Sequence, residues 1–445
     1  MTHGCYSEYT DAPGWLGSVP RSWDHAPLWA VATCNDEVIA EDTNPEHIIQ
    51  YVEISGVTAG QGITEVTDVA FGEAPSRARR KVRDGDVLVS TVRTYLRAIA
   101  PIKSPPVNMI ASTGFAVLRA RDIKAEYLSY AVQAEYFISE VIARSVGVSY
   151  PAINASDLMN ISVPVPSPAE QTAITTFLER ETGKIDALVE EQRRLIDLLK
   201  EKRQAVISHA VTKGLDPNAK IKPSGVAWLG DVPEHWEVKR LRFVARLNPS
   251  KSEIADRDRE EEVSFVPMDA VGVDGSLRLS EARSIASVET GYTYFQDGDV
   301  AIAKITPCFE NGKGAIMQAL QGGVGFGTTE LIVVRPTART SAEFIHWIVS
   351  STEFRRLGEG SMYGAGGQKR VPDEFVRNFY AAFPPLDEQR SIANFISDTI
   401  EQIGALEDQA NAAITLLSER RSALISAAIT GKIDVRQVHL DEVAA

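Results

Sequence analysis

The stretch EQTAITTFLERETGKIDALVEEQRRLIDLLKEKRQAVISHAVTKGLD, residues 170–216, decides the fold of this chain. Pro168 comes just before it and Gly214 lies near its end, as at the two ends of a helix. Its apolar residues fall on a grid of alternating steps of three and four: Ile174, Leu178, Ile185, Leu188, Leu195, Leu199 and Val206, with Glu181, Gln192 and Lys202 at the remaining grid positions. That spacing predicts a long helix whose apolar stripe packs on a second helix, as in a coiled coil. A lone helix cannot bury such a stripe, so the sequence must supply a partner.

The partner is a second copy of the same segment. Residues 388–434 align with residues 170–216 at an offset of 218 (388 minus 170). The same apolar spacing returns at Ile392, Ile396, Ile403, Leu406, Leu417 and Leu424. The start of each half repeats as well, because Trp15-Leu-Gly-Ser-Val-Pro20 returns as Trp228-Leu-Gly-Asp-Val-Pro233 at an offset of 213 (228 minus 15). The chain is therefore a duplicated two-part module.

The segments ahead of the two helices mix strand-like and helix-like runs, which predicts an α+β fold. The strand-like runs are 86–90, 114–118, 300–303 and 331–334, and the helix-like runs are 125–143 and 341–357. We expect a first globular mixed α/β domain at 1–166, a first long spacer helix at 167–216, a second mixed domain at 217–384, a second spacer helix at 385–436 and a tail at 437–445. Antiparallel packing of the two helices as a coiled coil would place one domain at each end, with pseudo-two-fold symmetry.

The composition limits where such a protein works and what it can bind. The net charge is −14, so any contact with nucleic acid must be confined to local basic patches. Cys5, Cys34 and Cys308 show no paired spacing, which is typical of reduced thiols. The sequence has no run of the ~18 apolar residues that a membrane span needs, and no apolar leader. We therefore expect a cytoplasmic protein that does not enter the membrane.

The first half carries the strongest basic run of this acidic chain. This run is either a solvated charged loop or a phosphate-binding strip. Its basic residues are Arg77, Arg79, Arg80, Lys81 and Arg83. A donor-rich loop follows the next strand and offers Arg93, Thr94, Tyr95 and Arg97. A later segment, either a plain turn or a second recognition loop, holds Ser149, Tyr150 and Asn154. Loops on a rigid sheet often carry recognition residues, so we expect these side chains to contact DNA.

Equivalent loops occur in the second half with different side chains. The loop after the strand-like run 300–303 offers Lys304, Thr306, Asn311 and Lys313, and the later loop offers Gln368, Lys369 and Arg370. Glutamine can pair with adenine, whereas lysine and arginine suit phosphates or guanine. The later loop of the first half lacks the basic pair of the second, so the two domains are expected to read different half-sites.

Together these motifs resemble type I restriction-modification specificity subunits. The resemblance rests on WLGxVPxxW opening each half, on residues 149–154, 306–314 and 364–370, and on the proline followed by Glu-Gln that starts each long helix. It implies that two target recognition domains each read one half of a bipartite, asymmetric site in double-stranded DNA, while the paired helices set the gap. It also implies that this subunit recruits two methyltransferase subunits and the restriction subunits without being catalytic.

The same resemblance assigns the cofactors to the partner subunits and none to this chain. S-adenosylmethionine would serve adenine N6 methylation, and ATP with magnesium would serve DNA translocation and cleavage. Docking of the partners is expected at Gln171, Phe177, Gln389 and Phe395. We expect Asp84-Gly-Asp86 and Asp297-Gly-Asp299 to be hairpin turns and not metal ligands. The tryptophans of the two repeated motifs are expected to lie in the cores of their domains and not to stack on bases. They are Trp15, Trp23, Trp228 and Trp236.

Two alternatives stay open. A specificity subunit of a related methyltransferase-nuclease system without a translocating subunit would have the same sequence features. A coiled-coil scaffold that joins proteins and does not bind DNA would suit the acidic total, although basic loops at equivalent positions argue against it. No catalytic constellation stands out in the sequence, so neither a metal site nor an enzyme activity is expected.

Overall fold

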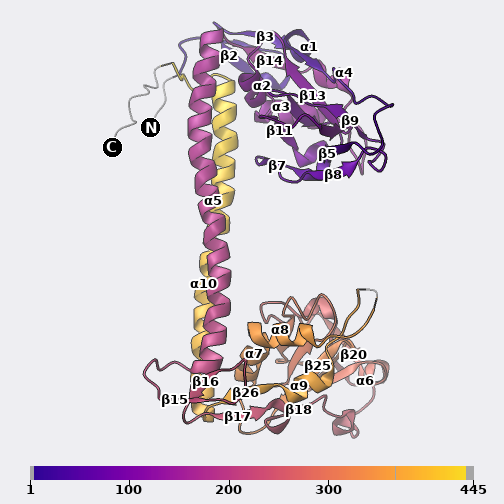
Figure 1. Cartoon of the computed structure of the whole chain (residues 1–445), viewed down its shortest axis with the longest axis vertical. Helices are drawn as coiled ribbons and strands as arrows, with labels where there is room; N and C mark the ends of the chain where they lie inside the picture. Colours follow the sequence, from indigo (N-terminus) through magenta and orange to yellow (C-terminus); the bar gives the residue numbers. More distant parts are fainter. Residues whose placement is uncertain (1–4, 366, 437–445) are drawn as a thin grey trace. The chain divides into compact units, whose positions relative to one another are not determined.

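The computed structural model describes residues 5–365 and 367–436, and the predicted tail at 437–445 lies outside them. The chain forms two compact units, Met1–Arg193 with Asn411–Ala445 and Arg194–Ala410 (Figure 1). Each unit holds one globular domain together with segments of two long helices. The mixed α+β architecture predicted from the sequence is confirmed.

Both long helices predicted from the apolar spacing are present. They are α5 (Pro168–Lys213) and α10 (Leu386–Ile429). Each ends shortly before a glycine with positive φ, Gly214 at 75° and Gly431 at 70°, a conformation that most other residues avoid. The helices therefore stop short of the predicted limits at 216 and 436.

Each unit contains the start of one long helix and the end of the other. In the first unit, Leu178 of α5 shares a hydrophobic core with Ile425 of α10. In the second unit, Val211 of α5 shares one with Ile396 of α10. Within each unit the paired segments consequently run antiparallel, as the sequence predicts.

The predicted apolar seam of the helices is buried only in part. Leu188, Leu195 and Leu406 are 46%, 40% and 46% exposed. A pair of helices covers only a narrow stripe on each partner, so wider apolar faces remain accessible. Despite these apolar faces, no described helix combines the length and hydropathy needed to cross a membrane.

The domain of the first unit is built on two four-stranded sheets. The strands are β4 Ala32–Cys34, β5 Ile48–Val52, β8 Thr67–Ala70, β9 Ala78–Lys81, β10 Val87–Ser90, β11 Ile99–Pro101, β12 Met109–Ser112 and β13 Phe115–Ala120. One sheet has the order β11-β10-β13-β4 and the other the order β8-β5-β12-β9. Only β12 and β5 pair in parallel, and the other pairings in these two sheets are antiparallel.

Shorter elements complete this domain. They are β1 Tyr9–Asp11, β2 Ser18–Pro20, β3 Asp24–Pro27, β6 Val57–Thr58, β7 Gly62–Ile63, β14 Ser162–Val165, α1 Leu28–Val31, α2 Ala125–Ala131, α3 Glu135–Arg144 and α4 Ala155–Met159. The single helix predicted at 125–143 is wrong, because Ala134 has an extended backbone (φ −68°, ψ 141°) and separates α2 from α3.

The domain of the second unit repeats the two sheets. Its strands are β18 Ala245–Leu247, β19 Glu262–Val266, β20 Glu281–Ser284, β21 Thr293–Gln296, β22 Val300–Ala303, β23 Gly314–Ile316, β24 Val324–Gly327 and β25 Leu331–Pro336. The orders are β18-β25-β22-β23 and β20-β19-β24-β21. The first order, read in reverse, corresponds to β11-β10-β13-β4, and the second corresponds directly to β8-β5-β12-β9. This agreement confirms the internal duplication at the level of the fold.

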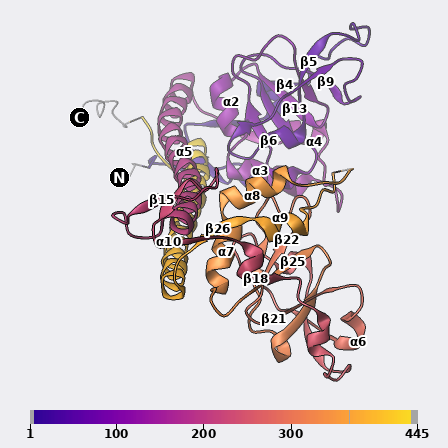
Figure 2. The same cartoon turned by 60° about the horizontal axis from the view of Figure 1, so that its bottom comes forward.

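The remaining elements of the second domain include a group of helices beside the first of these sheets. They are β15 Ile221–Pro223, β16 Asp231–Pro233, β17 Glu237–Arg240, β26 Tyr380–Phe383, α6 Ile285–Val288, α7 Ala342–Ser350, α8 Thr352–Gly360 and α9 Asp373–Asn378. Helix α7 lies against β22, β23 and β25 (Figure 2). The single helix predicted at 341–357 is wrong, because Ser351 is extended and caps α8 by accepting a hydrogen bond from Phe354 N.

The predicted tryptophan anchors differ in their burial. Trp23 and Trp236 are 3% and 0% exposed and lie in the two main cores, as predicted. Trp228 is half-buried and stacks on Phe379 at a centroid distance of 4.8 Å. Trp15 is 58% exposed, so its prediction as a core residue is wrong. The short 3-10 helix Gly14–Leu16 turns the neighbouring leucine inward in its place.

The two Asp-Gly-Asp motifs are turns but not hairpins. Each turn leads from one sheet to the other, because β9 and β21 belong to different sheets from β10 and β22. Asp86 is buried and accepts two 2.8 Å hydrogen bonds from Arg119 Nε and Nη2. Asp299 is bound in the same way by Arg335, at 2.6 and 2.7 Å. The second aspartate of each motif is thus a structural ion-pair partner in the middle of its domain.

Candidate nucleic-acid interface

In the first domain, two loops that are far apart in the sequence form one surface. The loop after β10 and the loop after α3 are joined through their backbones. Arg93 N donates to Pro151 O at 2.7 Å, and Ile153 N donates to Thr91 O at 2.9 Å. The structure therefore brings together two groups of residues that the sequence suggested separately.

An exposed stack between an arginine and a tyrosine lies on this surface. The guanidinium carbon of Arg93 lies 4.7 Å from the centroid of the Tyr150 ring, and the tyrosine is 61% exposed. Arg93 has a left-handed backbone, with φ of 53°. Stacking on an aromatic face orients the planar guanidinium and leaves its N–H edges free to bind a phosphate or a guanine.

The tip of the later loop is apolar. Val146 and Val148 are 80% and 102% exposed, and Gly147 between them has φ of 118°. Aliphatic side chains can contact the C5-methyl group of thymine in the major groove. The neighbouring Ser149 and Tyr150, predicted from the sequence to bind DNA, are also exposed. The two valines were not predicted, because nothing in their pattern indicates exposure.

Two of the predicted DNA-binding residues hold the loops in place. Thr94 is buried, and its hydroxyl is 2.7 Å from the hydroxyl of Ser145. Asn154 caps α4 by accepting a 2.8 Å hydrogen bond from Asp157 N. These contacts indicate that both side chains support the loop conformation. Tyr95, by contrast, is 52% exposed at the surface.

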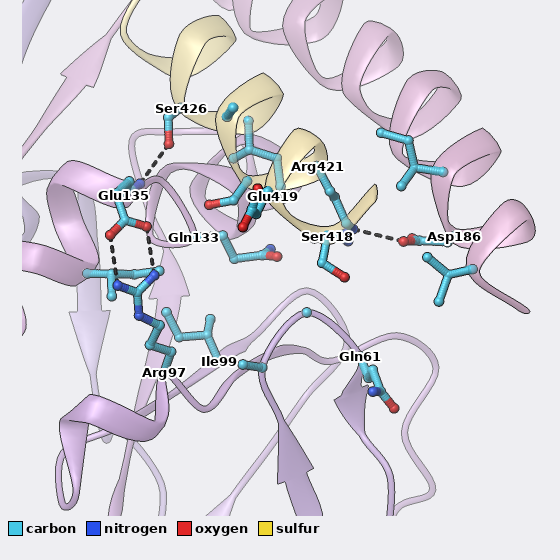
Figure 3. A pocket seen from close by; sticks show the side chains of 18 of the residues that line it. Gln61, Arg97, Ile99, Gln133, Glu135, Asp186, Ser418, Glu419, Arg421 and Ser426 are labelled. Carbon is cyan, nitrogen blue, oxygen red and sulfur yellow. Dashed lines mark hydrogen bonds and ion pairs between the residues drawn. The ribbon is translucent and has the colours of Figure 1, made fainter. Parts of the chain in front are cut away.

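Arg97 points into a pocket of about 880 Å³ that the domain forms with both long helices of its unit (Figure 3). Its guanidinium binds Glu135 through two hydrogen bonds of 2.8 and 2.9 Å. On the helix side, Arg421 Nε pairs with Asp186 at 2.9 Å. Ser426 Oγ accepts a hydrogen bond from Glu135 N at 2.8 Å. Arg97 is therefore already paired, and this ion-pair network joins the loop after β10 to the helices.

The basic run of the first domain is not a loop. Its centre is β9, the edge strand of its sheet. The strand is irregular, because its pairing with β12 shifts register between Ala111 and Ser112, opposite Arg80 and Ala78. Two of the five basic residues are neutralised, by Arg77–Glu53 at 3.2 Å and Arg83–Glu37 at 2.7 Å. Arg79 and Lys81 remain without a carboxylate partner within the described chain.

The second domain joins its two loops through the same backbone bonds. Thr306 N donates to Lys369 O at 2.9 Å, and Val371 N donates to Lys304 O at 2.8 Å. These residues stand at the repeat-equivalent positions of the four that join the loops of the first domain. The same two-loop surface is therefore present in both domains.

The side chains on this second surface differ from those on the first. Asn311, Gln368 and Lys369 are exposed. Arg370 is held by Glu330 through two hydrogen bonds of 2.8 and 2.9 Å, and this arginine lowers the pKa of the glutamate. Lys313 Nζ donates to Met268 O at 3.0 Å.

Three comparisons with known proteins agree with this architecture. The pattern described as "Type I restriction modification DNA specificity domain" matches residues 75–196. The EcoEI specificity subunit of Escherichia coli is 43% identical over 181 residues, and the EcoKI subunit of E. coli strain K12 is 21% identical over 433 residues. The latter alignment covers 94% of this chain and 90% of the relative. The chain is therefore similar to type I restriction enzyme specificity subunits over most of its length, and residues 75–196 match their DNA specificity domain.

The relatives of this specificity-subunit family match the chain to different extents. The EcoEI alignment covers 39% of this chain but only 30% of the relative's own length. A solved chain from a study of "complex assembly and conformational transition of the type I R-M system" has the same fold, with a TM-score of 0.62 and 22% identity. That likeness covers 92% of this chain and 98% of the solved one.

The residues predicted to dock partner subunits do not share one environment in the structure. Gln171 and Gln389 are 3% and 2% exposed, and each donates a 2.9 Å hydrogen bond to a proline carbonyl just before its helix. Both amides also accept a backbone N–H from their own domain, so they fix the start of the helix. Phe177 is buried in the first core, whereas Phe395 is 44% exposed. Burial thus removes the two glutamines and Phe177 from any docking face.

Proposed function

We propose that this chain is the DNA-reading specificity subunit of a type I restriction-modification complex. Each domain would read one half of a bipartite, asymmetric target in double-stranded DNA. The observation that carries the proposal is the repeated two-loop surface: identical backbone bonds build it in both domains, while the exposed side chains differ. A common frame with different side chains suits two domains that recognise two different half-sites.

The chemistry of the side chains suggests that some residues provide affinity for DNA and others provide sequence specificity. Arg79 and Lys81 of β9 would bind phosphates, which position a protein without reading sequence. The Arg93–Tyr150 stack would address base edges in the first half-site. Asn311, Gln368 and Lys369 would do so in the second. The net charge of −14 makes DNA contact depend on these local patches.

The exposed apolar side chains of the long helices support docking of partner subunits. In the first unit these are Leu188 and Leu416, and in the second unit Leu195, Leu198, Phe395 and Leu406, all at least 40% exposed. Exposed apolar residues on otherwise charged helices are typical of protein-protein interfaces. We propose that two methyltransferase subunits bind there, that restriction subunits join through them, and that the helix pair sets the spacing of the two half-sites.

The proposed subunit has no catalytic role of its own. Methylation with S-adenosylmethionine, and ATP- and magnesium-dependent translocation and cleavage, would belong to the partner subunits. The setting proposed for it is the cytoplasm, in keeping with the free thiols of Cys5, Cys34 and Cys308. One alternative agrees equally well with these structural features. It is a specificity subunit of a related methyltransferase-nuclease system that has no translocating subunit.

Band-shift assays with the partner methyltransferase present test the proposal. Binding should fall steeply with added salt, and unlabelled target DNA should compete far better than unrelated duplex. A complex that forms with the methyltransferase but never retains DNA would instead support the rival function, a coiled-coil scaffold.

A further inference from the structure

A small cavity in the second unit is lined by positive charge. It has a volume of about 30 Å³ and lies where the end of α5 meets α7, α8 and two loops. Arg203 comes from α5, His346 from α7 and Arg355 from α8. Gly312, which belongs to the first DNA-reading loop of this domain, completes the wall.

The two arginines lack a carboxylate partner. Within the described chain neither Arg203 nor Arg355 forms an ion pair. Arg355 Nη2 donates instead to the neutral amide oxygen of Gln204 at 2.6 Å. Burial and then repulsion by Arg203 lower the pKa of the Arg355 guanidinium. Both arginines are half-buried, and two like charges held close together are unfavourable unless something negative lies between them.

One carboxylate also lines the cavity and must be counted. Asp274 Oδ1 accepts hydrogen bonds from Ser276 N at 3.0 Å and from Ser276 Oγ at 2.6 Å. Its pKa is lowered mainly by these hydrogen bonds, with Arg203 as a minor cause. The formal charge of the lining is therefore +1, from two arginines and one aspartate.

Two residues that line the cavity each have a buried nitrogen atom without a hydrogen-bond partner. Arg355 Nε and His346 Nδ1 are buried and form no hydrogen bond within the described chain. His346 is only 7% exposed, and burial lowers its pKa to about 4, so near neutral pH the ring is uncharged and carries one N–H. A buried donor without an acceptor is destabilising, and native proteins seldom leave one.

We propose that this cavity binds one small inorganic anion of the halide class, held by Arg203, Arg355 and an N–H of His346. The volume admits a guest of about one or two water molecules, which suits a monatomic ion and excludes a free phosphate. A water molecule would satisfy unpaired N–H groups but would leave the net charge of +1 uncompensated. The site is independent of DNA binding and does not rest on the proposed function.

The position of the cavity gives the anion a structural role in two loops of this domain. Gly312 has φ of 76°, and a Cβ atom there would lie 3.2 Å from Arg355 Nη1. The loop backbone therefore rests against the arginine that holds the anion. Gly275 approaches the other side, where a Cβ would lie 3.0 Å from His346 Nε2. Binding an anion would thus fix both loops against α5 and α8.

Bromide is the probe for the first test, because its anomalous scattering identifies it among waters. Crystals of the full chain would be soaked in sodium bromide. We expect an anomalous peak between the two guanidinium groups in the wild type and in Arg356→Gln, whose arginine is the exposed neighbour on α8. The peak should be absent from Arg203→Gln and Arg355→Gln. Its absence from the wild type, or its persistence in both cavity variants, would overturn the proposal.

A solution measurement covers variants that do not crystallise. Exchanging gluconate for chloride at constant ionic strength should raise the thermal midpoint of the wild type and of Arg356→Gln by roughly 2–4 °C. Arg355→Gln should lose this shift. An equal shift in all three proteins would mean a general salt effect and would contradict the proposal. A shift produced by duplex DNA but not by chloride would assign the cavity to a backbone phosphate and would contradict it too.

Discussion

Trp23 Nε1 donates a 3.1 Å hydrogen bond to Glu170 Oε1, and through it the first domain is fixed to the start of α5. The same indole meets the end of α10, because a Cβ added to Gly431 would lie 3.2 Å from it. In the second unit Trp236 donates to Glu388 at 3.0 Å in the same way. One buried tryptophan thus connects the domain of each unit to a long helix.

Replacing the indole of Trp23 should therefore destabilise the first unit. Trp23→Phe keeps an aromatic ring but removes the donor to Glu170, and we expect a loss of about 1–3 kcal/mol of unfolding free energy. Urea unfolding followed by circular dichroism measures the loss. Trp29→Phe, at an exposed tryptophan of the same domain, is the control and should change stability by less than about 0.5 kcal/mol. Equal effects of the two substitutions would show that the hydrogen bond is unimportant.

The buried pair of Asp86 and Arg119 should be essential to the first domain. Asp86→Ala leaves the guanidinium without its main counter-charge, so we expect a loss of roughly 3–5 kcal/mol. Asp68→Ala, at an exposed aspartate of β8, should be nearly neutral. Denaturant midpoints of the two variants test this. A stable Asp86→Ala protein would mean that Arg119 finds enough compensation in Glu37, its second partner at 2.6 Å.

Arg93 should determine preference in one half-site only. Arg93→Ala removes the guanidinium that stacks on Tyr150, and we expect a loss of about 1–3 kcal/mol in binding to the specific target. Arg121→Ala, an exposed arginine that follows β13, is the matched control. Competition with duplexes altered in one half-site at a time separates the effects. An equal loss of preference in both half-sites would reduce Arg93 to a general phosphate contact.

The stability of the second unit should depend on pH through His346. Burial lowers the folded-state pKa of this histidine from 6.5 to about 4, so the unfolded chain takes up the proton first as the pH falls. The stabilisation is complete above pH 6.5 and is lost towards pH 4, amounting to roughly 3 kcal/mol. His346→Phe should flatten this slope, whereas His209→Gln, at an exposed site on α5, should leave it unchanged. Unfolding free energies measured at several pH values test this. A pH slope in His346→Phe equal to that of the wild type would contradict the role of His346.

The length of the helix pair should set the tolerated gap in the DNA target. Deleting residues 189–195 and 407–413, one heptad from each helix at equivalent positions, removes about 10 Å of rise per helix. We expect the preferred spacer to shorten by about three base pairs. Methylation of a library of targets with variable spacers measures it. An unchanged spacer preference in a folded, active complex would refute this role of the helices.

Elements that are encoded by a short-range pattern of residues could be predicted from the sequence. The long helices follow from apolar spacing, and their ends follow from Gly214 and Gly431. The strands after the Asp-Gly-Asp turns follow from short apolar runs. The break at Ala134 could not be anticipated, because alanine is the residue most typical of a helix interior. The break at Ser351 was missed although serine is favoured at the N-cap of a helix.

Sequence patterns do not predict which segments far apart in the chain contact one another. Asp86 finds Arg119 on another strand, and the loop of Arg93 finds that of Pro151. The sequence patterns therefore indicate candidate loops but do not indicate which of their side chains face outward. Arg97, for example, resembles Arg93 in sequence but is paired with Glu135.

Mapping methylated adenines in the genome of a host that carries the complete system tests the central proposal most directly. The wild-type subunit should give one asymmetric motif of two specific halves separated by a gap of unspecified bases. Arg93→Ala should relax one half of that motif and leave the other half intact. An uninterrupted motif, or methylation without any motif, would contradict the reading of DNA by two separate loop surfaces.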